Sequence, residues 1–145
     1  MIGIGIGAGI LRTNKDVHDS LFHTASSLTF GSFTLEPHKG DDGPAFWFDE
    51  RGNRGSMSTT NPRNDGLVAF LQKEMPSIRE RVSKGSARIH ISLCPLERGD
   101  IEKMGMILHQ HRELLSPVSY IEINAVRPNP RTGTFFHPVL SHDPE

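Results

Sequence analysis

Residues 87–94 read ARIHISLC, and the alternation in this stretch decides the fold class. Its odd-numbered residues from Ile89 to Leu93 are apolar, so they would share one face of a β-strand. Its even-numbered residues from Arg88 to Ser92 are polar and would share the other face, which is the pattern of a half-buried strand. Helical patterns precede and follow the stretch. We therefore expect it to be the central strand of a sheet.

The helical pattern before this strand is the longest in the chain. Over residues 64–82, apolar side chains recur every three or four positions, which predicts one buried stripe. Pro76 lies inside the stripe and cannot donate a backbone hydrogen bond, so a kink or two abutting helices should occur there. A second helix over residues 99–116 should lead into a last strand over 118–126. Strands joined by helices in this way are usually parallel.

The N-terminal stretch, residues 2–10, reads IGIGIGAGI, so one face of a strand would carry apolar side chains and the other only glycine. Glycine inside a strand costs about 0.5–1 kcal/mol relative to alanine, so another group should cover the bare face. We expect Phe or Trp side chains of neighbouring strands to lie across its four glycines, from Gly3 to Gly9. Their spacing does not match a nucleotide-binding fingerprint.

A helix and a group of strands should connect this stretch to the long helical pattern. Thr13 or Asn14 would cap the helix, which would run to about Ser26 with Asp16 near its positive end. Turn residues then separate short apolar runs, which favours an antiparallel hairpin or meander. The expected strands are residues 28–35 with a bulge at Gly31–Ser32, residues 45–49, and a short run around Met57.

Together these elements predict an α+β fold in the order β-α-β-β-(β)-α-β-α-β. One mixed sheet would carry helices mainly on one face, as in an open-faced sandwich. Residues 1–126 would form a single domain. Residues 127–145 contain four prolines and would form a C-terminal extension packed on or extending from that domain.

Composition excludes several classes of protein. Among 145 residues, 16 are Lys or Arg and 17 are Asp or Glu, so the totals carry no nucleic-acid footprint. Cys94 is the only cysteine, which excludes an internal disulfide and a Cys-based zinc site. The start lacks the basic region of a signal peptide, and no apolar run reaches the roughly 20 residues of a membrane span. We expect a soluble cytoplasmic protein without a metal ion or cofactor.

Two four-residue motifs raise an enzymatic hypothesis. His18 and Ser20 lie in HDSL, and His90 and Ser92 lie in HISL. This pair resembles the two H-x-[ST]-hydrophobic motifs of the two-histidine phosphoesterase family. The resemblance implies that one imidazole acts as base and the other as acid on a cyclic phosphate or RNA end, while the hydroxyls bind phosphate oxygens. The family has both motifs on strands, whereas His18 falls in the expected helix.

The expected hairpin suggests a binding site instead. Arg51 and Arg54 lie close to Trp47, and Trp and Arg are enriched in protein–protein hot spots. The same groups could contact single-stranded nucleic acid, but neighbouring acidic residues largely cancel their charge.

Because no complete catalytic, metal or nucleotide motif is present, a non-catalytic module that binds another protein is the leading hypothesis. By architecture it is similar to small immunity and inhibitor proteins, and its pattern specifies no oligomeric state.

Overall fold

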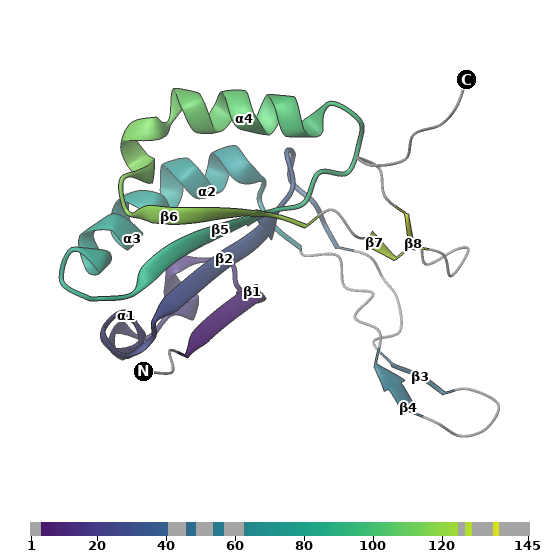
Figure 1. Cartoon of the computed structure of the whole chain (residues 1–145). Helices are drawn as coiled ribbons and strands as arrows, with labels where there is room; N and C mark the ends of the chain where they lie inside the picture. The colour runs from purple at the N-terminus through teal and green to yellow at the C-terminus, as the bar shows by residue number, and fades with distance from the viewer. Residues whose placement is uncertain are drawn as a thin grey trace.

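Four parallel strands form the main sheet of the computed structural model, which describes residues 4–40, 46–48, 54–56, 63–124, 127–128 and 135–136. Their order in space is β1-β2-β5-β6 (Figure 1). The order in space is therefore the same as the order of these four strands in the sequence. The bounds of these strands are β1 Gly5–Leu11, β2 Ser27–Phe33, β5 Arg88–Leu93 and β6 Val118–Ile123.

The other strands that the structure describes form two short antiparallel ladders. The ladders are β3 (Phe46–Phe48) with β4 (Arg54–Ser56), and β7 (Arg127–Pro128) with β8 (Phe135–Phe136). The helices are η1 Asn14–Asp16, α1 Asp19–Thr24, α2 Leu67–Lys73, α3 Met75–Val82, α4 Asp100–Gln110 and η2 Arg112–Leu115.

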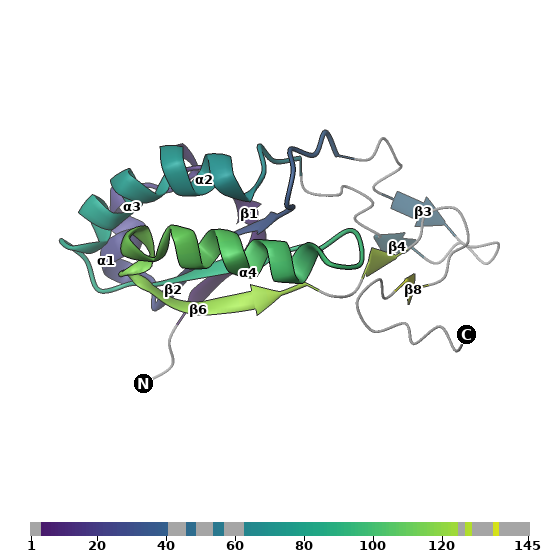
Figure 2. The same cartoon turned by 90° about the horizontal axis from the view of Figure 1, so that it is seen from above.

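The helices pack mainly on one face of the sheet. Since every crossover between the parallel strands proceeds in the same direction, a common hand places the connecting helices on the same side. Figure 2 shows α1, α2 and α3 together on one side of the strands, and Figure 1 shows α4 running above β6. The predicted α+β class is confirmed, with parallel pairing in the main sheet and antiparallel pairing in the two short ladders.

The core lies between the sheet and these helices. Leu28 and Phe30 of β2 and Ile89 and Ile91 of β5 are fully buried, so the alternation of residues 87–94 places the strand as expected. From α2, α3 and α4 the buried side chains are Leu67, Phe70, Leu71, Met75, Ile78 and Met104. None of the helices in the described part of the chain has the length and apolar character to cross a membrane.

The long helical pattern divides where the sequence predicts. Helix α2 ends at Lys73 and α3 begins at Met75, so only Glu74 separates them. Pro76 lies in the first turn of α3. Backbone N–H groups in a first turn have no partner within the helix, so the missing proline donor is tolerated there.

The predicted bulge in β2 is also confirmed. Pairing with β5 shifts register between Phe30 and Phe33, and Gly31 has a φ of 113°. A Cβ atom on Gly31 would collide with the backbone oxygen of Ser92. Only glycine meets both the backbone conformation and the close approach.

The single helix expected from Thr13 to Ser26 is wrong. Thr13 caps only η1, Val17 and His18 are extended, and α1 begins at Asp19. The carbonyls of Asn14 and Val17 accept hydrogen bonds from Arg81, and the Asn14 carbonyl also accepts the Val17 N–H at 3.4 Å in the turn of η1. Tertiary contacts therefore divide the segment.

The expected faces of the N-terminal strand are also wrong in part. Gly5 and Ile6 pair with Ser27 and Leu28, but a register shift follows, after which Leu11 is buried and Ile10 is 68% exposed. Among the described residues, the atoms nearest to a Cβ position on Gly5 or Gly7 include no aromatic side chain. Nothing lies within 4 Å of a Cβ on Gly7, and a Cβ on Gly5 would meet the Ser27 hydroxyl at 2.5 Å.

The hairpin of β3 and β4 has the predicted antiparallel pairing, whereas β2, expected in the same antiparallel group, pairs in parallel with β1 and β5. Arg54 and Gly55 belong to strand β4. The last strand of the main sheet ends at Ile123, earlier than the expected Val126. Most of the expected C-terminal extension lies outside the described residues.

Candidate functional site

His90 lies on the face of the sheet opposite the main helical layer. Its neighbours along β5, Ile89 and Ile91, point into the core, so the His90 side chain points the other way. Its half-buried ring meets the ring of Tyr120 edge to face, with centroids 5.5 Å apart. Strand pairing places the two residues side by side on β5 and β6.

Ser92 lies on the same face, within a chain of hydrogen bonds that joins three strands. The Asn124 amide donates to the Ser32 hydroxyl at 3.4 Å, and the hydroxyls of Ser32 and Ser92 are 2.8 Å apart. Ser92 then donates to Glu122 Oε1 at 3.1 Å. Ser92 has no exposed surface. Its hydroxyl is therefore committed to connecting β2, β5 and β6, because no solvent-borne phosphate could reach it.

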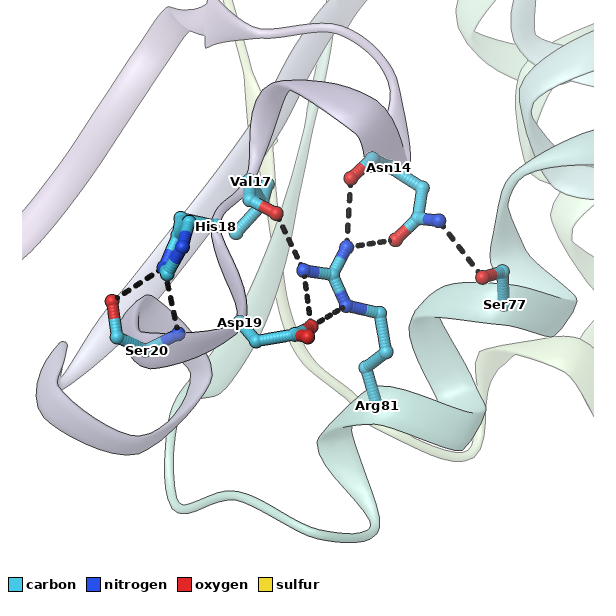
Figure 3. A network of polar contacts seen from close by, with 7 residues as sticks. All are labelled: Asn14, Val17, His18, Asp19, Ser20, Ser77 and Arg81. Carbon is cyan, nitrogen blue, oxygen red and sulfur yellow. Dashed lines mark hydrogen bonds and ion pairs between the residues drawn. The ribbon is translucent and has the colours of Figure 1, made fainter.

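His18 caps helix α1. Its Nδ1 accepts a hydrogen bond from the backbone N–H of Ser20 at 3.3 Å and lies 2.9 Å from the Ser20 hydroxyl (Figure 3). Helix α1 packs in the helical layer, because its Phe22 belongs to the same core as Ile89. His18 and His90 thus lie on opposite sides of the sheet, and the structure does not bring the two histidine motifs together.

A second network holds α1 in that layer. The Arg81 guanidinium of α3 contacts Asp19 Oδ1 at 2.7–2.8 Å and donates to the Asn14 carbonyl at 2.7 Å (Figure 3). It also donates to the Asn14 side chain and to the Val17 carbonyl, and it lies 4.3 Å from the centre of the Phe22 ring. All five N–H donors are occupied, so Arg81 is a structural residue.

The expected binding residues fall on or near the β3–β4 ladder. Trp47 pairs with Gly55, and Arg54 pairs with Phe48. The side chains of these residues, and Arg51 as a whole, lie outside the described part of the chain. Their role in binding stays a prediction.

Exposed apolar side chains lie on β6 and α4, and sequence reasoning missed them. Tyr120 is 58% exposed, Ile121 38% and Ile123 49%, and Met106 of α4 is 59% exposed. We call the three strand residues the β6 edge. Tyr120 shares a face with His90, whereas Ile121 and Ile123 share the face of Ile91 and Leu93. The signal was available, because a strand apolar on both faces usually requires burial on both faces.

A pocket lies near the carboxyl ends of β1 and β2, beside α2. It holds about 230 Å³. Its lining comes from residues directly after β1, from the end of β2 and from the segment that includes α2. The sequence offered no local signal for it. The lining residues are Arg12, Thr13, Phe33, Arg63, Asn64, Asp65, Gly66, Ala69, Phe70, Lys73 and Glu74.

Neither a known protein family nor a curated protein matches this sequence. Across the described ranges, no three His, Cys, Asp or Glu side chains gather closely enough to hold a metal ion. Two structural features can be interpreted in terms of function, namely the β6 edge and the pocket beside α2.

Proposed function

We propose that this protein binds an extended segment of a partner protein along the β6 edge. The observation that carries the proposal is the exposure of Tyr120, Ile121 and Ile123 on a strand that pairs, among the described residues, only with β5. An edge strand presents unpaired backbone N–H and C=O groups on its outer side. An incoming strand can pair with these groups while its side chains contact the apolar residues.

The chemistry of this edge supports the proposal. Natural proteins usually protect an edge strand with Lys, Pro or inward-pointing charges. Residues 118–123 read VSYIEI, and their single charged side chain, Glu122, accepts a hydrogen bond from Ser92. No charge on the strand therefore stands between an incoming segment and the aliphatic side chains.

Energetics indicate a modest affinity from side chains alone. Full burial of a large apolar side chain gains about 1.5–3 kcal/mol, and these three are already about half buried. Their remaining surface contributes roughly 3 kcal/mol, which is less than association costs. Backbone pairing must supply the rest, so the partner segment has to be extended.

A partner segment fits this edge better than a second copy of the chain. Six residues of strand span about 20 Å. Two rigid copies that met edge to edge would contact mainly over this length, which is short for the roughly 1,200 Å² that stable complexes bury. An extended segment can follow Tyr120 on one face and Ile121 and Ile123 on the other.

A selection from a displayed library of random peptides tests the proposal. For the peptide that binds best, we expect Ile121→Lys and Ile123→Lys each to weaken affinity at least about tenfold, because each places a charge against an apolar contact. Ile10→Lys is the matched control, since Ile10 is an exposed aliphatic on the opposite edge strand. It should leave affinity unchanged.

Three outcomes would contradict the proposal. One is a library that yields no binder, and another is a binder that is indifferent to both β6 variants. The third is a dimer, detected by light scattering, that Ile121→Lys dissociates, since a second copy would then be the occupant.

A further inference from the structure

We propose that the pocket beside α2 binds a small organic anion, with Arg63 and Lys73 holding an oxyanion group above an apolar lining. This site is separate from the β6 edge and does not depend on the function proposed there. Its position agrees with a general rule, since ligands of parallel sheets bind near the carboxyl ends of the strands. Arg12 and Thr13 directly follow β1, and Phe33 ends β2.

The charged side chains that line the pocket are Arg12, Arg63, Lys73, Asp65 and Glu74, and two of the three cations have no side-chain partner in the described part of the chain. Asp16 lies outside the lining and attracts Arg12, while Glu74 Oε2 accepts the Asn14 backbone N–H at 2.7 Å. Within the described ranges, the side chains of Arg63 and Lys73 make no hydrogen bond or ion pair. Both side chains are exposed. They can therefore turn toward an incoming anion without breaking an existing contact.

Two backbone donors at the start of α2 are already in use. The Gly66 N–H donates to Asn64 Oδ1 at 2.9 Å, and the Leu67 N–H donates to the Thr34 carbonyl at 2.9 Å. The side-chain cations therefore remain as charged donors for an anion in this pocket. Arg63 offers a fork that matches two oxygens of a carboxylate or phosphate, and Lys73 offers a point charge.

Three apolar side chains of the lining, Phe33, Ala69 and Phe70, provide the surface for the body of the ligand. Ala69 is half-buried beside Phe33 and Phe70, whose rings stack with centroids 4.1 Å apart. A cavity of about 230 Å³ accommodates one ring and its charged group. The chemical class is therefore a carboxylate or phosphate monoester with a small apolar body.

Titration by nuclear magnetic resonance at low ionic strength tests this site with three probes of similar shape. Benzoate and phenyl phosphate distinguish the two oxyanions, and benzamide is the neutral counterpart. We expect saturable shifts of the amides of Thr13, Asp65, Gly66 and Lys73 with at least one of the two anions. Added salt should weaken the binding, because the contacts are exposed charges.

Variants separate the site from general attraction to a cationic surface. Arg63→Gln and Lys73→Gln should each reduce affinity by about fivefold or more, since each removes a charge-assisted contact. Arg98→Gln and Lys103→Gln are matched controls, because both side chains are exposed and neither makes a hydrogen bond or ion pair within the described ranges. They should change affinity little. All four substitutions are on the surface, so the fold should persist.

The proposal is overturned if neither anion gives saturable shifts or if benzamide binds as well as both anions. Equal losses from the pocket variants and their controls would also overturn it. If inorganic phosphate binds as tightly as phenyl phosphate, the apolar lining contributes nothing to affinity, and the proposed ligand class with an apolar body is wrong.

Discussion

Arg81 shows how one residue can decide local structure against helical preference. Its side chain is 19% exposed, whereas that of its ionic partner Asp19 is 82% exposed. An ion pair to so exposed a carboxylate contributes little. The hydrogen bonds to the Asn14 and Val17 carbonyls contribute more to stability, because a half-buried acceptor that loses its donor costs free energy.

We therefore predict that Arg81→Met lowers the free energy of unfolding by roughly 2–3 kcal/mol, since it removes charge-assisted bonds to two backbone carbonyls. Asp19→Asn should cost less than about 1 kcal/mol. Urea unfolding measures both. Arg79→Met on the same helix is the control, because Arg79 is exposed and makes one long hydrogen bond of 3.4 Å. Similar losses for Arg79→Met and Arg81→Met would contradict this account.

Asp16 makes a pH-dependent contribution to stability. Partial burial raises its pKa, but hydrogen bonds from the backbone N–H groups of Thr13 and Arg12, from the Thr13 hydroxyl, and the charge of Arg12 together bring it below the ordinary value. A lowered pKa in the folded state means that the carboxylate stabilises the fold. This contribution is complete above the unfolded pKa of about 4 and is lost as pH falls through the folded pKa.

Asp16→Asn should accordingly cost about 0.5–1 kcal/mol at pH 7, because an exposed cap is at the low end of such effects. The difference from wild type should shrink when urea unfolding is repeated near pH 3. Glu97→Gln, at an exposed residue, should differ little from wild type at either pH. A cost of Asp16→Asn that did not depend on pH would indicate that the carboxylate charge is irrelevant.

At the scale of elements, the bulge in β2 depends on contact with β5. We predict that Gly31→Ala lowers the free energy of unfolding by about 2–4 kcal/mol, because the added methyl meets the Ser92 carbonyl and disfavours a positive φ. Gly105→Ala in α4 is the matched control. Nothing surrounds a Cβ there, so alanine should stabilise the helix by about 0.5–1 kcal/mol. Thermal unfolding that moved in the same direction for both variants would refute this interpretation.

The elements that the sequence predicted correctly have strong local signals. Alternation placed residues 87–94 in the middle of the sheet, and Pro76 marked the boundary between α2 and α3. Gly31 and Ser32 interrupted an apolar alternation, which located the bulge in β2. In each case neighbours along the chain contain the physical cause, so a single sequence is sufficient.

The wrong predictions concern residues whose neighbours in space come from segments that are distant in the sequence. Alternation through Ile10 gave no sign that β1 shifts register and turns Leu11 into the core. His18 caps α1 and does not lie inside a longer helix. The Arg81 side chain, 63 positions later, donates hydrogen bonds to the Asn14 and Val17 carbonyls in the segment where that helix was expected. The pocket joins segments separated in the same way. Tertiary contacts decide these features, and local propensity does not include them.

At the scale of the whole molecule, the order of the main sheet determines where binding can occur. Sequential parallel strands with crossovers of one hand place the helices mainly on one face and, among the described residues, leave two edges, β1 and β6. Glycine makes β1 poor in side chains to contact, whereas β6 presents aromatic and aliphatic groups. This asymmetry favours β6 as the edge that pairs with another chain.

Hydrogen exchange measured by mass spectrometry tests that asymmetry in the free protein. Amides of β2 and β5 should exchange only through global unfolding, because both strands pair on two sides and carry the buried core. Amides of β6 that point away from β5 should exchange at least about 100-fold faster. If they are instead as protected as those of β5, another segment or copy already occupies the edge. Protection that decreases on dilution would identify that occupant as a second copy, and protection independent of concentration would place it within the same chain.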